Sequence, residues 1–129
     1  MGAKSSSNAS RFTIAYCDEN NIHSEWFKFD NRLVDYLLGL MSDSDIYSSS
    51  EWAISTDDAK ALAYTMCAIL QYQKDGCINE RLEQFLNIRS ERLSKVAFEH
   101  AKTLIDDSRI ALAERIYNGS KGGRPPINQ

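Results

Sequence analysis

Residues 55–76, STDDAKALAYTMCAILQYQKDG, carry the clearest helix signal in the chain. The stretch begins with hydroxyl side chains, which cap helices, and with Asp57 and Asp58, whose charges are favourable in a first helical turn. Gly76 follows Asp75 and can adopt the left-handed conformation that ends a helix. One side of this helix carries Leu62, Ala63, Met66, Ile69, Leu70 and Gln73. The spacing predicts an amphipathic helix with one face in a hydrophobic core.

Residues 30–41 and 79–86 predict two shorter helices on either side of this stretch. Asp30 and Asn79 stand at their first positions, where a short polar side chain can accept a hydrogen bond from the first helical turn. Their apolar positions are Leu33, Val34, Leu37, Leu38, Leu82, Phe85 and Leu86. The first helix is expected to end in the Ser/Asp-rich residues 42–50, which predict a loop.

Residues 90–117 show a longer helical pattern, with Ser90 as a candidate cap. Asp, Asp and Ser at residues 106–108 either interrupt this pattern or lie within it, so the segment forms one helix or two. Asn118 and Gly119 are expected to stop it, because both residues favour helix ends.

Residues 11–29 predict a β-hairpin at the N-terminal side of the domain. Apolar and polar side chains alternate over residues 11–17, which is a strand signal, and residues 18–21 predict a turn. The alternative for the second strand is a helix starting near Ser24, because the aromatic residues that follow do not alternate. A further strand is a candidate at the apolar residues 51–54.

The length of 129 residues fits one domain better than two. We expect a flexible arm at residues 1–10, a single globular domain at residues 11–118 and a flexible tail at residues 119–129. The predicted fold class is mainly α (α+β), a compact bundle of four to five helices with a small N-terminal β-hairpin element.

The composition predicts a cytoplasmic protein. No apolar run approaches the roughly 18 residues of a membrane span, and the first residues lack the apolar region of a secretory signal. The net charge of −3 is unevenly distributed: residues 1–75 hold 6 basic and 11 acidic side chains, whereas residues 76–129 hold 9 basic and 7 acidic ones. An acidic half therefore precedes a basic half.

The tail sequence Ser-Lys-Gly-Gly-Arg-Pro-Pro, residues 120–126, carries two resemblances. It resembles a minimal AT-hook, which implies that Arg124 and Lys121 contact the minor groove of DNA. This copy lacks a basic residue before its core glycine and after its prolines. The longer stretch from Glu114 to Pro126, a charged helix that runs into this tail, is similar to the ends of small phage and plasmid replication-accessory proteins, which implies an origin in a mobile element. A solvated tail after a helix is the alternative for so short a segment.

Basic side chains recur along the helix predicted for residues 90–117. The candidates for contact with nucleic-acid phosphates are Arg92, Lys95, Lys102 and Arg109. Glu91, Glu99 and Asp106 lie three or four residues from them. The same spacing favours a ladder of ion pairs on a solvated face, which is the preferred interpretation.

Histidine and cysteine form no recognisable catalytic or metal-binding pattern. Cys17 and His23 could form a thiol–imidazole pair across the predicted turn, but no third group orients the imidazole. Cys17, Cys67 and Cys77 lack the spacing of metal ligands and are expected to be small buried hydrophobic side chains. We therefore predict no catalytic residue, no metal and no cofactor.

Aromatic side chains concentrate in the acidic half of the chain. Most large rings are buried, but rings that remain exposed are strong anchors in protein–protein contacts. The candidates for a protein-binding face are Trp26, Trp52, Phe27 and Tyr47.

These observations together predict a non-enzymatic accessory or regulatory protein of a phage or mobile element. It would act by protein–protein binding, as an inhibitor or adaptor of host nucleic-acid machinery. The alternative is a DNA-binding module that uses the basic half and the Gly-Arg-Pro tail. The sequence predicts a protein partner and no membrane, and it leaves nucleic acid and a homodimer open.

Overall fold

The structure is a computed structural model that describes residues 12–40 and 56–120. Within these two segments it contains five α-helices, one 3₁₀ turn and no β-strand, so the prediction of a mainly helical chain is confirmed. The elements are α2 (Ile14–Glu19), α3 (Asn31–Leu38), α4 (Thr56–Asp75), α5 (Glu80–Leu86), η2 (Arg89–Glu91) and α6 (Arg92–Ser120). Three predicted segments lie outside the described residues. They are the strand at residues 51–54, the arm at residues 1–10 and the tail from residue 121 onwards.

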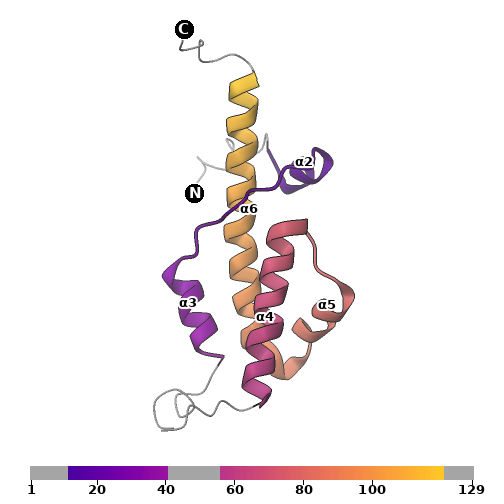
Figure 1. Ribbon diagram of the computed structural model, residues 1–129, viewed down its shortest axis with the longest axis vertical. Coiled ribbons are helices and arrows are strands. Elements are labelled where there is room, and N and C mark those ends of the chain that lie inside the picture. Colours follow the sequence, from indigo (N-terminus) through magenta and orange to yellow (C-terminus); the bar gives the residue numbers. More distant parts are fainter. Residues whose placement is uncertain (1–11, 41–55, 121–129) are drawn as a thin grey trace.

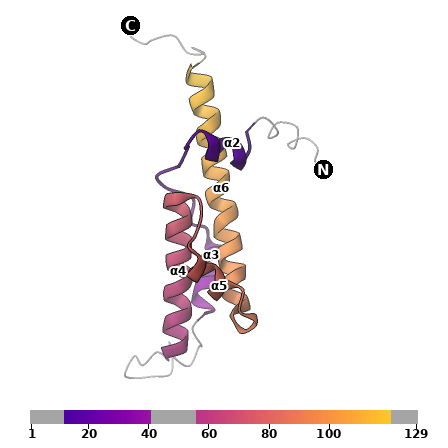
Figure 2. The ribbon, with the colours of Figure 1, turned by 90° about the vertical axis from the view of Figure 1, so that its right-hand side faces the viewer.

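Helix α6 is the element on which the other helices assemble (Figures 1 and 2). It has 29 residues, which corresponds to about 43 Å, and α2, α3, α4 and α5 all contact it. Residues 106–108 lie inside α6, so a single helix runs through this segment. The helix stop predicted at Asn118 and Gly119 is wrong, because α6 continues to Ser120. A glycine costs a helix only about 1 kcal/mol, which is too little to end one of this length.

Most helix ends follow from local signals. Asp30 and Asn79 each cap a helix by accepting the backbone N–H three residues further on, at 2.9 and 2.8 Å. Gly76 has a φ of 79° and terminates α4. These three predictions are confirmed. The cap predicted at Ser90 is wrong, because this residue lies within η2 and α6 begins at Arg92.

The main hydrophobic core lies between α6 and the three helices α3, α4 and α5. It consists of Leu33, Leu37, Ala68, Ile69, Tyr72, Leu82, Leu86, Ala97, Phe98, Ala101 and Ile105. Ala68 of α4 and Ala101 of α6 are fully buried, and such small side chains allow helices to pack closely. The prediction of which side of α4 is buried is only partly correct, since Tyr72 is buried whereas Leu70 is exposed.

The β-hairpin predicted for residues 11–29 is wrong, because Ile14–Glu19 form α2 and a loop follows it. Thr13 Oγ1 caps α2 by accepting a hydrogen bond from Tyr16 N at 3.1 Å. Alternation over so few residues is a strand signal that local capping and tertiary burial can override. The cap and burial against α6 favour the helix here. The second, smaller core formed at this place consists of Phe12, Cys17, Ile22 and Ala113.

Candidate functional site

The structure places the described site residues in two regions, the loop between α2 and α3 and helix α6. It describes Trp26, Phe27, Arg92, Lys95, Lys102 and Arg109. The first two lie in the loop between α2 and α3, and the others lie along α6. Tyr47, Trp52, Lys121 and Arg124 are outside the described residues.

The loop between α2 and α3 holds Trp26 in solvent on a fixed backbone. Ser24 Oγ donates a hydrogen bond to the carbonyl of Trp26 at 2.6 Å, which closes a tight turn. Gln73 of α4 donates from Nε2 to the carbonyl of Ser24, also at 2.6 Å, and so ties this turn to α4. Trp26 itself is 66% exposed. The indole is therefore presented by a loop whose backbone is held at its base.

Two further aromatic rings support this loop. Phe27 is half-buried and packs against the main core. Its ring stacks on that of Phe29, with the centroids 5.9 Å apart, and Phe29 is 45% exposed. Phe27 therefore anchors the loop, whereas Trp26 and Phe29 are open to contact. Phe29 was not among the residues predicted for this face.

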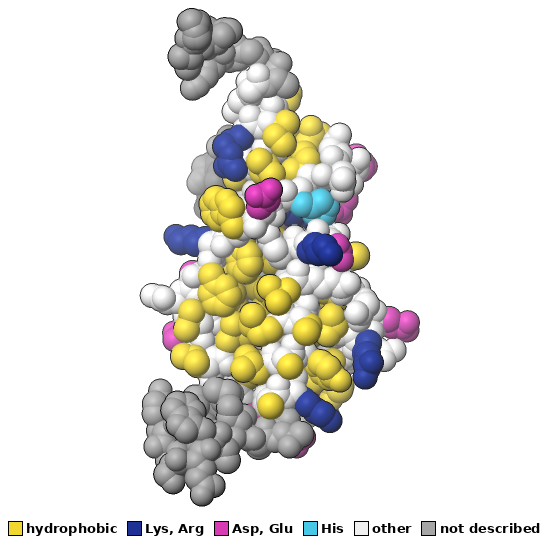
Figure 3. Space-filling model, in the orientation of Figure 1, with side chains coloured by type: hydrophobic (Ala, Val, Ile, Leu, Met, Phe, Trp, Pro, Cys, Tyr) yellow, Lys and Arg dark blue, Asp and Glu magenta, His cyan; other side chains and the backbone are white. Residues whose placement is uncertain are grey.

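One side of α4 carries further apolar side chains and ends at the residue that binds the loop. Leu62, Met66 and Leu70 follow one another at four-residue intervals and lead to Gln73, which binds the loop. Figure 3 shows hydrophobic side chains gathered over this part of the molecule. The surface is called the apolar face below, and it consists of Trp26, Phe27, Phe29, Leu62, Met66 and Leu70.

Leu62, Met66 and Leu70 were all predicted to face the core, and Leu70 is the one of these three that is exposed. It is 58% exposed. The signal that could have identified it is the width of the apolar pattern on α4. The apolar positions of α4 span a wider arc than one packed side needs. Leu62 and Met66 are half-buried against the main core, and Leu70 is exposed.

An aspartate–histidine contact fixes the second end of the loop. His100 Nε2 lies 3.0 Å from both carboxylate oxygens of Asp30, and the ring of Tyr36 meets the imidazole edge-on. The pKa of the Asp30 carboxyl is lowered, first by the hydrogen bond from Leu33 N and then by His100. Asp30 thus caps α3 and binds α3 to α6 with the same carboxylate.

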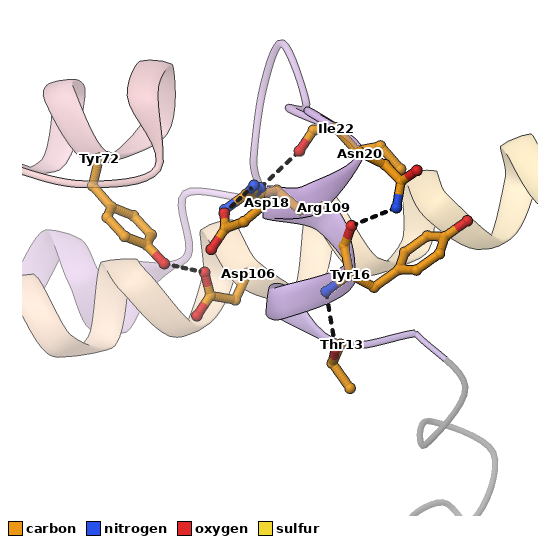
Figure 4. A network of polar contacts seen from close by, with 8 residues as sticks. All are labelled: Thr13, Tyr16, Asp18, Asn20, Ile22, Tyr72, Asp106 and Arg109. Carbon is orange, nitrogen blue, oxygen red and sulfur yellow. Dashed lines mark hydrogen bonds and ion pairs between the residues drawn. The ribbon is translucent and has the colours of Figure 1, made fainter.

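Arg109 is fully buried where α2 meets α6 (Figure 4). Its Nε donates to the carbonyl of Ile22 at 2.8 Å, and its Nη2 lies 2.8 Å from Asp18 Oδ1. Both the phosphate contact and the solvated ion pair predicted for Arg109 require an exposed guanidinium. The structure corrects both, because this side chain serves to hold α2 on α6.

Asp106 was predicted to pair with basic side chains of its own helix, but its hydrogen-bond partner is a tyrosine of α4. Tyr72 Oη donates to Asp106 Oδ1 at 2.5 Å (Figure 4). Burial raises the pKa of Asp106, while the Tyr72 hydrogen bond and the charge of Lys102 lower it. Burial likewise raises the pKa of the Tyr72 hydroxyl. The contact is a hydrogen bond between α4 and α6 at the edge of the core.

Lys95 and Lys102 line a cleft of about 510 Å³ between α5, the end of α4 and α6. Lys95 Nζ donates to Asn87 Oδ1 at 3.0 Å, and Lys102 Nζ lies 5.6 Å from the centre of the Tyr72 ring. In the two described segments neither lysine forms an ion pair, so the predicted ladder is not formed around them. This space is called the α5–α6 cleft below. Arg92 is exposed and lies outside it.

Cys17 and His23 do not form a hydrogen-bonded pair, although both belong to the described segments. Cys17 is fully buried, and burial raises the pKa of its thiol. Cys67 and Cys77 are exposed, so the prediction that all three cysteines are buried holds only for the first. Among the described residues no group of three His, Cys, Asp or Glu side chains is placed to hold a metal ion.

No protein-family model matches the chain, and no curated protein or solved structure matches it either. Over the described residues no helix combines the length and the hydropathy that crossing a membrane requires.

Proposed function

We propose that this protein is a non-enzymatic accessory module that binds another protein through the apolar face. The observation that carries this proposal is the placement of Trp26, an exposed indole on a loop fixed by Ser24 and Gln73. Tryptophan is among the residues that dominate the binding energy of protein interfaces. The resemblance of the tail to phage and plasmid accessory proteins supports the same kind of role.

The fixed loop favours tight binding. Ordering a flexible loop on binding costs free energy, and a loop that is ordered beforehand avoids most of this cost. The turn at Ser24 and the contact of Asp30 with His100 hold the loop at both ends. Phe27 holds its middle against the core. The indole of Trp26 can therefore enter an apolar pocket of a partner without reorganising the loop.

The composition around the indole also fits an interface. Interfaces have an apolar centre and a polar rim. Phe29 and Leu70 supply further apolar surface, and the exposed Glu25 and Lys28 lie on either side of Trp26 in the sequence. The expected partner surface is an apolar pocket surrounded by polar groups.

Capture of partners by purified protein tests the proposal. Wild-type protein, Trp26→Ala, Leu70→Ala and a control variant Ile116→Ala are each incubated with host lysate. Ile116 is 51% exposed near the end of α6 and does not belong to the apolar face. We expect a specific partner to be retained by the wild type and the control and to be lost by the other two variants. Far-UV circular dichroism verifies that all variants remain helical.

The affinities of the wild type and the variants for the captured partner decide whether Trp26 is part of the binding site. A hot-spot tryptophan is worth about 2 kcal/mol or more, so Trp26→Ala should weaken binding by roughly thirtyfold. Ile116→Ala should leave the affinity unchanged. Equal affinities for the wild type and Trp26→Ala would refute the assignment of this face.

The nucleic-acid alternative loses Arg109, which is buried, and keeps the tail together with Arg92, Lys95 and Lys102. Lys121→Ala combined with Arg124→Ala tests it in a mobility-shift assay with A·T-rich duplex DNA. A shift that weakens with salt and disappears in the double variant would support this alternative. A wild-type protein that produces no shift at low salt rules it out.

A further inference from the structure

The α5–α6 cleft is a second surface with the features of a binding site, separate from the apolar face. Its volume of about 510 Å³ lies within the range of roughly 300–1,000 Å³ for small-molecule sites. Ile78, Leu86 and Phe98 contribute apolar side chains to its wall. Phe98 and Leu86 belong to the main core, so this part of the wall is rigid.

Two ammonium groups are held at this cleft, and neither forms an ion pair among the described residues. Lys95 is positioned by Asn87 Oδ1 at 3.0 Å, and Lys102 lies over the ring of Tyr72. A neutral amide and an aromatic ring do not neutralise an ammonium group. The charge of Lys102 also acts on Asp106, which is half-buried and bound to Tyr72. Both charges are available to an anionic group of a ligand.

Two carboxylates line the same cleft and also lack a cationic partner among the described residues. Glu99 lies four residues after Lys95 and three residues before Lys102, a spacing that allows ion pairs along a helix. The structure forms neither of these pairs. Glu83 of α5 is the second carboxylate of the cleft. Charges of both signs therefore surround an apolar wall without neutralising one another.

We propose that the α5–α6 cleft binds a free α-amino acid with a large apolar side chain. The carboxylate of such a ligand pairs with Lys95 or Lys102, and its ammonium pairs with Glu99 or Glu83. The side chain packs on the wall that contains Phe98. A zwitterion with an apolar group is the simplest ligand that offers a carboxylate to the lysines, an ammonium to the glutamates and an apolar surface to the wall. This proposal is independent of the proposed protein-binding function.

The two exposed cysteines provide a test on the unmodified protein. Cys77 lines the cleft, whereas Cys67 is exposed on α4 and is not part of the cleft. Alkylation by iodoacetamide is followed by mass spectrometry for each thiol, with and without L-tryptophan. We expect L-tryptophan to slow alkylation of Cys77 and to leave the rate at Cys67 unchanged. Equal rates at Cys77 with and without saturating ligand would overturn the proposal.

Two analogues of L-tryptophan separate the contributions of the charges. Tryptamine lacks the carboxylate and indole-3-propionate lacks the amine, while both keep the indole. A charge-assisted contact contributes enough for each analogue to bind about tenfold more weakly than L-tryptophan. The affinities are measured from chemical shifts of the backbone amides in the cleft. Three equal affinities would show contact with the apolar wall alone and would refute the amino-acid assignment.

Variants of the charged residues assign the contacts. Lys95→Gln combined with Lys102→Gln should weaken L-tryptophan and indole-3-propionate about tenfold and leave tryptamine unchanged. Glu83→Gln combined with Glu99→Gln should weaken L-tryptophan and tryptamine and leave indole-3-propionate unchanged. Arg92→Gln, an exposed position outside the cleft, is the matched control. Loss of binding in this control to the same extent would contradict the assignment.

Discussion

Arg109 Nη2 lies 2.8 Å from Asp18 Oδ1 across 91 positions of sequence, and this contact joins the short helix α2 to the long helix α6. The guanidinium is fully buried, whereas the aspartate side chain is 55% exposed. A helix of six residues is far shorter than the roughly 12–15 residues that an isolated helix needs in water. The position of α2 therefore depends on this contact and on the small core around Cys17.

Asp18→Asn should lower the free energy of unfolding by about 1–2 kcal/mol. Removing one partner of a buried charge is costly, but exposure of Asp18 to solvent reduces this cost. Urea unfolding followed by circular dichroism measures the change. Glu19→Gln, an exposed neighbour in α2, is the control and should have little effect. Similar losses in the two variants would mean that the ion pair contributes nothing specific.

Gly76→Ala should destabilise the fold by roughly 1–3 kcal/mol. Gly76 has a φ of +79°, and a Cβ at this position would lie 3.2 Å from both Arg109 Nη1 and His23 Cε1. Thermal unfolding measures the loss. Gly119→Ala is the matched control, since that glycine is helical and has no atom within 4 Å of an added Cβ. The control should be unchanged or stabilised by up to about 1 kcal/mol; a stable Gly76→Ala variant would contradict the argument.

Asp30→Asn should reduce the pH dependence of stability in the acid range. The pKa of Asp30 is 3.8 as the ordinary value and lower in the folded state. The carboxylate therefore contributes its full stabilisation at pH values above 3.8. That stabilisation is lost as the pH falls through the folded pKa. Asparagine remains a good N-cap, so the variant isolates the effect of the charge. Melting temperatures between pH 2 and pH 7 should converge for the wild type and the variant at the acid end and differ at neutral pH.

Asp106→Asn should show the opposite dependence on pH. Burial raises the pKa of Asp106 above 3.8, so the folded state holds its proton more tightly than the unfolded state. The stability contributed by this group is complete at low pH and falls as the pH rises through the folded pKa. The stability of the variant minus that of the wild type should therefore increase as the pH rises from 3 to 7. A difference between variant and wild type that decreases over this range would contradict the raised pKa of Asp106.

Tyr72→Phe should destabilise the fold by about 1–2 kcal/mol, because it leaves the half-buried Asp106 without its hydrogen-bond donor. Tyr72 Oη lies 2.5 Å from Asp106 Oδ1. Urea unfolding of the single variants and of the combined Tyr72→Phe, Asp106→Asn variant separates the two contributions. We expect the second substitution to recover part of the loss. Strictly additive effects would show that the hydrogen bond makes no contribution of its own.

Features with short-range causes could be predicted from the sequence. The caps at Asp30 and Asn79 and the end of α4 at Gly76 each depend on residues within four positions. The choice between one helix and two at residues 106–108 stayed open in the sequence. The structure resolves it in favour of one helix, in which Asp106 accepts a hydrogen bond from Tyr72 of α4.

Features with long-range causes could not be predicted. Arg109 belongs to a basic pattern in the sequence, and its burial depends on Asp18 and Ile22, which lie 91 and 87 positions away. The exposure of Leu70 depends on which side of α4 contacts α6. For Trp26 the sequence supplied the residue type, whereas the fixed loop that presents it depends on Gln73, 49 positions from Ser24.

The assembly of all other helices on α6 has a consequence for synthesis of the chain. Asp18 leaves the ribosome before its partner Arg109 has been translated. At about 5–20 residues per second, the 91 positions between them take between about 5 and 18 seconds. During this interval the apolar side chains of α2 and α3 lack the complete surface of α6 on which they pack. The N-terminal part of this fold therefore completes its structure only after translation has reached α6, and chaperones have that time in which to bind it.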